Sequence, residues 1–447
     1  MHRRDFLHDG TILLAGLALS RGARRDLFPQ HNVDTPPKVN GQRLNATLAQ
    51  LSRYGSNPQG GVSRVAYSDA DREGRLYIRS LMENAGLEVR LDAAGNLFGK
   101  SSGRRATEPS ILFGSHADSV PEGGNFDGDV GTMSAIEVMR TLGEQRIVTD
   151  HPLEAVCWQN EEGLLFGSRA FAGLAKSSDL DLGSTSGKTI RDGTAFIGGD
   201  PSHIDSAKRA PGTVACYLEL HIEQGGTLER DHVDIGVVEG IVGIWEWTVT
   251  VTGFANHAGT TPMDQRKDAL LSAARFIEMV HRVVRAERGR QVGNVGQIRA
   301  EPGAPNVIPG KVVMSLELRD LESATVDRMY ARITDEARTI GAADGTSFAF
   351  TPISASQPAR CDPRLQQVIT TSARELGLSS RPMPSGAGHD AQEVARVAPV
   401  GMIFVPSVGG ISHSPKEFTK PEDVERGANV LLRSVLAADR LFESAPT

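Results

Sequence analysis

Residues 114–131 read GSHADSVPEGGNFDGDVG, and the organisation of the rest of the chain follows from this stretch. It begins where the apolar run Ile111-Leu112-Phe113 ends, places His116 and Asp118 one residue apart, and returns Asp127 from a glycine-rich loop. A buried strand that ends in an imidazole, a carboxylate that can fix the tautomer of that ring, and glycines that admit a second ligand are typical parts of a metal site. Taken alone, the motif also fits a satisfied core histidine before an ordinary Asp-Gly turn.

Three further apolar segments end in histidine or glutamate: EAVCWQNEEGLLF at 154–166, LELHIEQG at 218–225 and GISHSPKE at 410–417. One strand-end site is unremarkable, but four of them supply enough ligands for two adjacent zinc-like ions. Manganese and cobalt are alternatives, because imidazoles and carboxylates also suit these ions. The predicted metal ligands are His116, Asp127, Glu162, His221 and His413.

In combination, these motifs resemble the hydantoinase/carbamoylase branch of the dinuclear zinc amidohydrolases, relatives of aminoacylases and glutamate carboxypeptidases. The resemblance runs from residue 39 to the C-terminus. It implies an α/β fold: a zinc-peptidase-like catalytic domain with a mostly parallel sheet, and an inserted ferredoxin-like α+β domain that serves as lid and dimerisation domain. The motifs that carry it, in the family's order, are GSHADS, GGNFDG, NEEG, ELHIEQG, NHAGTTPM, NVIPG, SGAGHDA and GISHSPKE.

The composition is that of a globular protein long enough for two or more domains, with 447 residues, 39% hydrophobic and 23% charged. A net charge of -7 and a pI near 6.0 argue against nucleic acid or an anionic membrane as the main partner. The cysteines are too few and too scattered for a disulfide framework or a metal site, so we expect small core residues. They are Cys157, Cys216 and Cys361.

The N-terminus has the form of an export signal. MHRRDFL at 1–7 places twin arginines before Phe6-Leu7, and residues 11–19 form a short apolar run that cannot span a bilayer. This resembles a twin-arginine signal, which would carry the folded protein to the periplasm. Because residues 20–25 contain no clear cleavage site, a disordered or loosely helical leader on a cytoplasmic protein is the alternative. We assign residues 1–30 to signal and leader, and expect no membrane contact after its removal.

Helical and strand patterns alternate up to residue 142. Ser68-Asp69 can cap a helix with Leu76 among its inward-facing positions, and a short strand pair follows at 88–91 and 96–99. Residues 130–142 form a helix entered directly from the Asp127 loop. Strands that alternate with helices predict a largely parallel sheet, whose ligand sites lie beyond the carboxyl ends of the strands.

The pattern changes near residue 240. Strands and helices now follow in the order β-α-β-β-α-β, which describes a ferredoxin-like domain. The predicted elements are strands at 245–252, 294–300, 312–319 and 347–351, and helices at 268–288 and 323–339. We therefore place the two parts of the catalytic domain at 31–240 and 357–447, and the lid at 241–356.

Two adjacent ions and one spare carboxylate can hydrolyse an amide-like bond. The ions lower the pKa of a water molecule, and Asp127 can bridge them with its two oxygens. By resemblance to the NEEG pair, Glu161 is the base that accepts the proton and returns it to the leaving nitrogen; otherwise it is a plain surface glutamate. Asp118 completes the catalytic set. The expected ligand pairing is His116 with His221 for one ion, and Glu162 with His413 for the other.

Five further residues are candidates for substrate binding. The resemblance implies that His257 is an oxyanion donor reaching across from the partner subunit, where a turn-stabilising imidazole is the alternative. Arg319 could bind a substrate carboxylate in a bidentate fork, unless it is a strand-edge charge that faces solvent. Asn306, Gln224 and backbone donors near Gly388 would complete the contacts. A rigid swing of the lid would then bring Arg319 and Asn306 onto the substrate.

These observations predict a homodimeric two-zinc amidohydrolase that cleaves the C–N bond of a linear N-carbamoyl (ureido) carboxylate and releases ammonia and CO2. Candidate substrates are N-carbamoyl-L-amino acids, allantoate, ureidoglycolate and 3-ureidopropionate. An aminoacylase or dipeptidase would use the same site, but HIEQG and NHAGTTPM favour the ureido branch. A non-catalytic ligand-binding relative is the third possibility, and the complete ligand set with Glu161 argues against it. Leu165 and Gly226 depart from the family's usual Arg and Pro without removing a ligand or the base.

Overall fold

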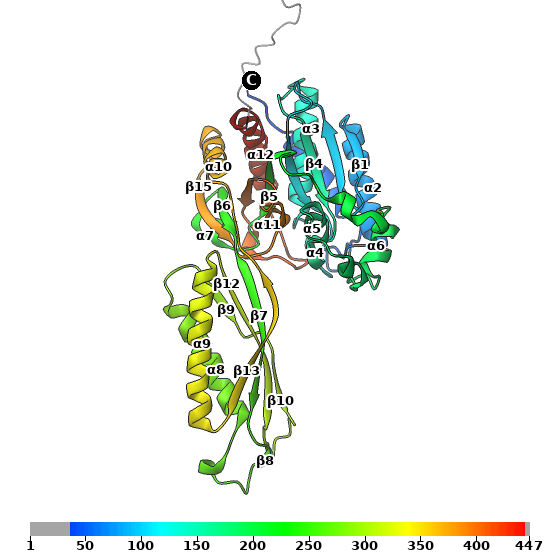
Figure 1. Ribbon diagram of the computed structural model, residues 1–447. Helices are drawn as coiled ribbons and strands as arrows, with labels where there is room; N and C mark the ends of the chain where they lie inside the picture. Colours follow the sequence, from blue (N-terminus) through cyan, green and yellow to red (C-terminus); the bar gives the residue numbers. More distant parts are fainter. Residues whose placement is uncertain (1–35, 443–447) are drawn as a thin grey trace, which may run out of the picture. The chain divides into compact units, whose positions relative to one another are not determined.

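Two large sheets organise the chain in the computed structural model, which describes residues 36–442 (Figure 1). The predicted export signal at residues 1–30 lies outside the described residues, so export stays a prediction. Within the described range, the helices are too short or too polar to cross a membrane. The three cysteines are buried and free, as expected.

The larger sheet has nine strands, and the four at its centre are parallel. Its path is β1-β2-β4-β3-β5-β16-β6-β14, with β15 also paired to β6. The central four run in the order β4-β3-β5-β16, so their carboxyl ends meet at one edge. The strands are β1 Glu88–Leu91, β2 Leu97–Ser101, β3 Ser110–His116, β4 Leu153–Trp158, β5 Val214–Ile222, β6 Ile235–Ile241, β14 Ala359–Arg360, β15 Ser380–Ser385 and β16 Val400–Val405.

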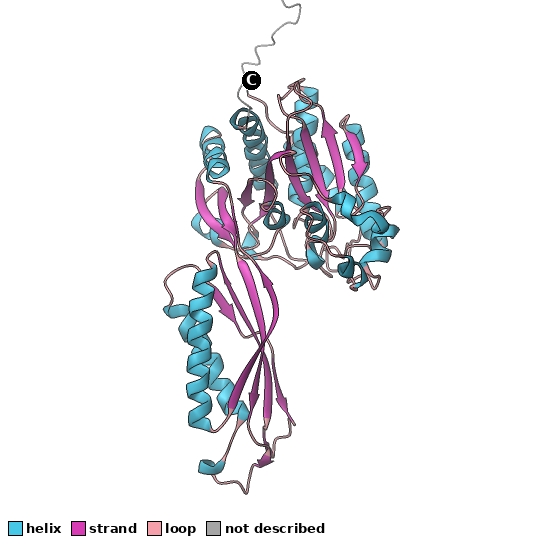
Figure 2. Cartoon of the chain, in the orientation of Figure 1, coloured by secondary structure: helices cyan, strands magenta, loops and turns pink. Residues whose placement is uncertain are grey.

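Helices cover both faces of this sheet (Figure 2), which explains why its central strands are apolar throughout. In β3, Ile111 and Phe113 pack into the core on one face, and Leu112 into the core on the other. The first face is covered by α1 Gly41–Leu51, α2 Asp69–Asn84, α3 Asp129–Glu144, α10 Pro363–Glu375 and α12 Pro421–Leu441. The second is covered by α5 Phe166–Phe171, α7 Thr227–Asp231 and α11 Asp390–Val394.

Helix α2 begins as predicted, with the Ser68 side chain accepting a hydrogen bond from the Asp71 N–H at 3.1 Å. The inward placement of Leu76 is wrong, because this side chain is 60% exposed. Two residues correspond to about 200° around a helix, so Leu76 lies opposite the fully buried Ile78. Arg75 takes the inward position instead, and its guanidinium donates to the Trp158 carbonyl at 3.1 Å.

The second large sheet has the order β10-β12-β7-β13, with every neighbouring pair antiparallel, and this is the predicted ferredoxin-like insert. Its elements follow the pattern β-α-β-β-α-β. Helices α8 and α9 lie on one face of the sheet, where they pack against Val249 and Leu316. The elements are β7 Gly243–Thr252, α8 Ala269–Ala286, β9 Val292–Asn294, β10 Ile298–Glu301, β12 Lys311–Asp320, α9 Ser323–Asp344 and β13 Ser347–Ser356. A separate pair, β8 Asn256–His257 and β11 Val307–Ile308, accompanies this sheet.

Three elements within the insert differ from the predicted ones. The expected strand at 294–300 is divided into β9 and β10, because the Ser315 hydroxyl accepts the N–H groups of Gly296 and Gln297, both at 3.1 Å, and interrupts the ladder. Helix α9 and strand β13 each continue five residues beyond the predicted ends at 339 and 351. Short elements complete the chain: α4 Glu161–Leu164, η1 Ser177–Asp181, α6 Ile190–Phe196, η2 Pro201–Ala207, η3 Met263–Gln265 and η4 Val408–Gly410.

A buried arginine joins the elements beneath the Asp127 loop. The Arg64 side chain is 1% exposed and forms an ion pair with Asp129, the first residue of α3, which is equally buried. Its remaining N–H groups donate to three carbonyls: Leu51 at 2.9 Å, Tyr54 at 2.9 Å and Ala117 at 2.6 Å. One guanidinium therefore links the end of α1, the segment after β3 and the start of α3.

We expect Arg64→Ala to destabilise the protein by about 3–5 kcal/mol, because it leaves the Asp129 carboxylate buried without its partner. Urea unfolding followed by circular dichroism measures this change. Arg79→Ala is the matched control, since Arg79 pairs with Glu83 on the exposed surface of α2 and such pairs contribute less than about 1 kcal/mol. Equal, small losses for both variants would contradict the structural role of Arg64.

Candidate metal centre

The predicted ligands lie at the carboxyl edge of the parallel strands. His116 is the last residue of β3, His221 is the next-to-last residue of β5, and Glu162 lies in α4, directly after β4. Asp127 comes from the loop between β3 and α3, and His413 from the loop after β16. Because the four central strands are parallel, residues far apart in sequence meet at this edge.

Asp127 lies between two groups of potential ligands. Its Oδ1 is 3.1 Å from His221 Nε2 and 3.6 Å from His116 Nε2, while its Oδ2 is 3.2 Å from His413 Nε2. Glu162 Oε1 lies 3.5 Å from His413 Nε2. The structure thus brings all five predicted ligands together in two groups of three that share Asp127: His116, Asp127 and His221, and Asp127, Glu162 and His413.

The spacing of these donor atoms fits a metal ion. Two ligands that each lie about 2.1 Å from a tetrahedral ion are separated by about 3.4 Å, and the observed donor separations are 3.1–3.6 Å. Glu162 Oε1 is buried without a hydrogen-bond partner among the described residues. A cation between the donors would satisfy this atom, which is otherwise costly to bury.

The pKa shifts of the site's ionisable groups also favour a bound cation. Burial raises the pKa of Glu161 well above its usual value and that of Glu162 to about 7, and neighbouring carboxylates add to both shifts. Burial lowers the pKa of His116, but Glu161 and Asp127 outweigh this effect and raise it well above its usual value. Contact with Asp127 raises the pKa of His413 to about 9. The site therefore concentrates negative charge that a bound cation would stabilise.

The backbone around the ligands adopts conformations that are uncommon for residues with side chains. Asn160, Gln224 and His413 have φ values of 56°, 58° and 53°. Gly128 has a φ of 66°, and a Cβ atom at this position would overlap the His116 ring. Such conformations cluster at functional sites, where the surrounding structure holds them.

The role predicted for the Asp118 carboxylate on His116 is wrong. His116 Nδ1 lies 2.9 Å from the backbone oxygen of Asp118, whereas the Asp118 carboxylate is 3.9 Å away. A carbonyl can only accept, so it fixes the tautomer with a proton on Nδ1 and leaves Nε2 facing Asp127. The carboxylate instead accepts the N–H groups of Glu161 and Glu162, each at 3.2 Å. The Asp118 carboxylate therefore orients the two glutamates, and the Asp118 backbone carbonyl orients the histidine ring.

Several residues of the site escaped the sequence analysis. Glu219 and His389 form a third close group with His221, and the His221 and His389 rings meet edge to face at 4.5 Å. Two features of the sequence could have indicated this group. Glu219 and His221 are two residues apart and so lie on the same face of one strand, and His389 lies in the segment GHDA. Gln224, predicted to bind substrate, donates its side-chain N–H to Asp127 Oδ2 at 2.7 Å. Ser412 and Glu417, described below, were also missed.

The structure separates the predicted substrate residues of the insert into two places. His257 and Asn306 lie together, since His257 pairs with Val307 and the Ala258 N–H donates to the Asn306 carbonyl at 3.0 Å. Arg319 pairs with Ile244 at the opposite end of β7 and β12, next to the catalytic sheet.

Ten residues of β-strand extend for about 33 Å, so one lid cannot bring both ends onto one substrate, and the predicted joint closure of Arg319 and Asn306 is wrong. Arg319 instead reaches the loop that contains Gly388. Its Nη1 donates to the Gly386 carbonyl at 2.8 Å, and its Nε to Glu317 at 2.8 Å.

Comparison with known proteins agrees with this architecture. The model of Peptidase family M20/M25/M40 matches residues 112–437. N-carbamoyl-L-amino acid amidohydrolase of Geobacillus stearothermophilus is 39% identical, with 89% of this chain and 98% of that protein covered. Allantoate amidohydrolase of Bacillus subtilis is 35% identical, with coverage of 85% and 93%. The crystal structure of a hydantoinase/carbamoylase family amidase from Burkholderia multivorans superposes with a TM-score of 0.84 at 38% identity, with coverage of 90% and 98%.

The fold and the site are those of a hydrolase with two candidate metal-ligand groups at the carboxyl edge of its sheet. The chain belongs to Peptidase family M20/M25/M40, and the resemblance to its hydantoinase/carbamoylase members is confirmed.

We expect the two ligand groups to lose metal separately. His221→Ala should remove one ion per chain and His413→Ala the other, whereas Asp127→Ala should remove both, because Asp127 alone belongs to both groups. Elemental analysis of protein dialysed against a weak chelator measures metal per chain. His203→Ala, an exposed histidine of η2, is the control and should keep the wild-type content. Loss of a single ion in Asp127→Ala would contradict the shared role.

Proposed function

We propose that this protein hydrolyses the C–N bond of a linear N-carbamoyl carboxylate and releases ammonia and CO2, using two metal ions, with zinc as the first candidate. The single observation that carries the proposal is the Asp127 carboxylate shared by two ligand groups with Glu161 beside them. The named activities of the relatives, on N-carbamoyl-L-amino acids and allantoate, support a ureido substrate. An aminoacylase or dipeptidase is not favoured by these relatives.

Glu161 is placed to act as the proton acceptor. Its Oε2 lies 3.7 Å from His116 Nε2, the nitrogen that also faces Asp127, so the carboxylate borders the space enclosed by the first ligand group. When bound, the ions supply Lewis acidity that activates a water molecule and polarises the ureido carbonyl. Glu161 takes the proton of this water and returns it to the leaving nitrogen, while the Asp118 carboxylate holds the Glu161 N–H in place.

The substrate carboxylate is assigned to Arg319. The guanidinium lies at the junction of insert and catalytic sheet and already contacts the loop at residues 386–388, where backbone N–H groups near Gly388 can add donors. A planar guanidinium can hold a carboxylate through two parallel hydrogen bonds. Gln224 lies beside Asp127 and can turn its amide toward the same substrate.

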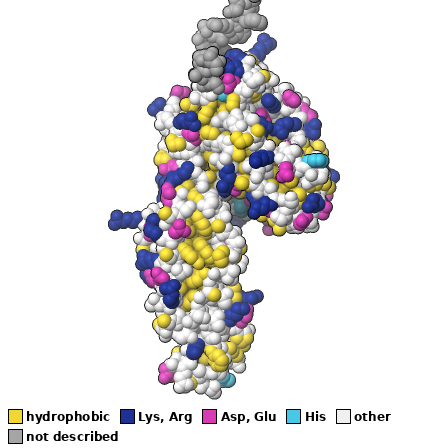
Figure 3. Space-filling view, viewed as in Figure 1, with side chains coloured by type: hydrophobic (Ala, Val, Ile, Leu, Met, Phe, Trp, Pro, Cys, Tyr) yellow, Lys and Arg dark blue, Asp and Glu magenta, His cyan; other side chains and the backbone are white. Residues whose placement is uncertain are grey.

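We propose that His257 and Asn306 serve the site of a second copy in a homodimer. Both lie at the end of the insert that is farthest from their own metal ligands, and His257 is exposed. Hydrophobic side chains gather over the insert in the view of Figure 3, consistent with a surface that is covered on assembly. Large hydrophobic residues of the insert that are more than half exposed are Phe254, Met263, Val292, Ile298 and Ile353.

We also propose that residues 1–30 export the protein to the periplasm.

We expect ammonia release from N-carbamoyl-L-amino acids or allantoate, and none from N-acetyl-L-amino acids or dipeptides. A coupled ammonia assay over this panel, with amine release as the second readout, tests the proposal.

Glu161→Gln should keep both ions and lower kcat by about two to four powers of ten, because the amide cannot accept the proton. Turnover of the acetyl compounds alone would favour the aminoacylase reading, and an unaffected Glu161→Gln rate would place the base elsewhere.

The shared-site proposal predicts complementation between two inactive variants. His257→Ala and Glu161→Ala, mixed and allowed to exchange subunits, should regain part of the wild-type rate, because a heterodimer has one site with both residues intact. Native mass spectrometry verifies the exchange, and each variant mixed with itself is the control. Heterodimers that form without regaining activity would show that His257 does not act across the interface.

A further inference from the structure

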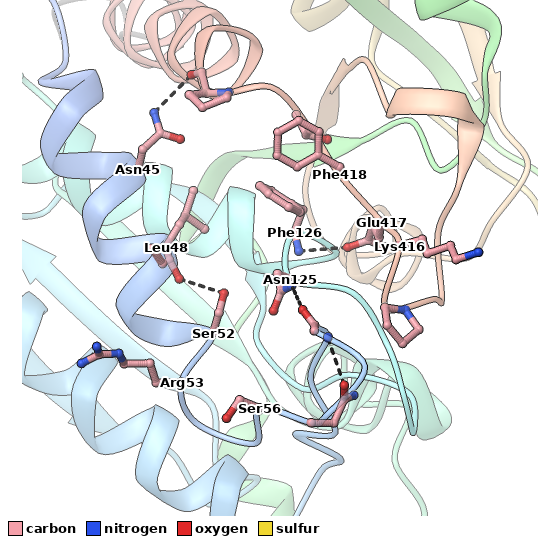
Figure 4. A pocket seen from close by; sticks show the side chains of 17 residues that line it. Asn45, Leu48, Ser52, Arg53, Ser56, Asn125, Phe126, Lys416, Glu417 and Phe418 are labelled. Atoms are coloured by element: carbon pink, nitrogen blue, oxygen red, sulfur yellow. Dashed lines mark hydrogen bonds between the residues drawn. The ribbon is translucent and has the colours of Figure 1, made fainter.

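Glu417 connects the loop that carries Asp127 with the loop that carries His413. Its side chain is 3% exposed, and its Oε1 accepts two consecutive backbone N–H groups, from Phe126 at 2.9 Å and from Asp127 at 3.0 Å. Figure 4 shows Glu417 beside Phe126 and Phe418 at the edge of a cavity of about 640 Å³. The carboxylate thus holds the backbone of the Asp127 loop through two consecutive N–H groups.

The other oxygen of Glu417 reaches the residue next to His413. Oε2 accepts a hydrogen bond from the Ser412 hydroxyl at 2.8 Å, and the same hydroxyl lies 3.1 Å from Asp127 Oδ2. Gly124 makes room for this arrangement, because a Cβ atom at that position would overlap the Glu417 carboxylate. The three side chains therefore form a closed network across two loops that are far apart in the sequence.

The two ligand groups differ in how firmly the fold holds them. His116 and His221 lie at the carboxyl ends of buried strands, and their side chains are 1% exposed. The His413 side chain is 49% exposed and lies on a loop at a φ of 53°. Strands hold the two histidines of the first group, whereas the position of His413 in the second group depends on contacts between loops.

We propose that Glu417 is a positioning residue for the ion held by Asp127, Glu162 and His413. It does not belong to the ligand group, but it sets the position of Asp127 relative to His413 and so determines how well this ion is bound. The inference rests on the proposed function, because it presupposes that the two groups hold metal. Residues that orient ligands in this way commonly contribute 10–100-fold to metal affinity.

A purely structural carboxylate is present elsewhere for comparison. Asp439 in α12 accepts two consecutive backbone N–H groups, from Asp150 at 3.0 Å and from His151 at 2.8 Å, and is 9% exposed. It belongs to neither ligand group. Asp439→Ala therefore removes the same kind of loop anchor without touching a ligand loop.

The test is a titration of metal-free, full-chain protein with Co²⁺ in competition with a chromophoric chelator, which resolves two affinities. Glu417→Ala should weaken the affinity for the ion held by Asp127, Glu162 and His413 by about 10–100-fold. The affinity for the ion held by His116, Asp127 and His221 should stay within about threefold of the wild-type value. Ser412→Ala removes one link of the network and should weaken binding of the ion held by Asp127, Glu162 and His413 by a smaller factor. Asp439→Ala should lower the melting temperature but leave both affinities as in the wild type.

The outcomes separate the inference from the proposal beneath it. Wild-type protein that binds no Co²⁺ would overturn the metal centre itself. Two wild-type affinities that persist in both Glu417→Ala and Ser412→Ala would overturn the role of Glu417 alone, as would an equal loss of the second ion in Asp439→Ala. If Glu417→Ala does not fold, Ser412→Ala decides the matter by itself.

Discussion

The arrangement of this protein depends on one carboxylate, Asp127, placed between two sets of imidazole and carboxylate donors. Each of its oxygens faces a different set, at 3.1 Å from His221 and 3.2 Å from His413. Packing several carboxylates at a buried edge is unfavourable unless cations balance them, as the raised pKa values of Glu161 and Glu162 indicate. The apolar cores on both faces of the parallel sheet stabilise the catalytic domain and offset this unfavourable free energy at the site.

The support for Asp127 comes from several directions. Arg64 pairs with Asp129 at the start of α3, just beyond the Asp127 loop, and Glu417 holds the N–H groups of the loop itself. Gly128 lets the chain pass close to the His116 ring. The insert follows a different principle: strand β7 extends for about 33 Å from the junction with the catalytic sheet, and His257 lies beyond its far end, which is the basis of the role proposed for it in a second copy.

The sequence was sufficient for the features that follow from strand periodicity and parallel pairing. His116, Glu162 and His221 could be placed at one edge because each follows or ends a buried apolar strand, and parallel strands end together. The partner of His116 Nδ1 could not be predicted, because a backbone carbonyl and a carboxylate two residues away compete for it. Glu417 was missed because its contacts join loops that meet only in the folded chain. The position of Leu76 was predicted wrongly because the inward face of α2 holds a buried arginine, Arg75.

The most direct test of the shared carboxylate is anomalous diffraction from crystals of the zinc-loaded protein, with data collected on both sides of the zinc edge. The account predicts two anomalous peaks per chain, one within bonding distance of each oxygen of Asp127, with His116 and His221 around one and Glu162 and His413 around the other. A single peak, or two peaks that do not both contact Asp127, would contradict it.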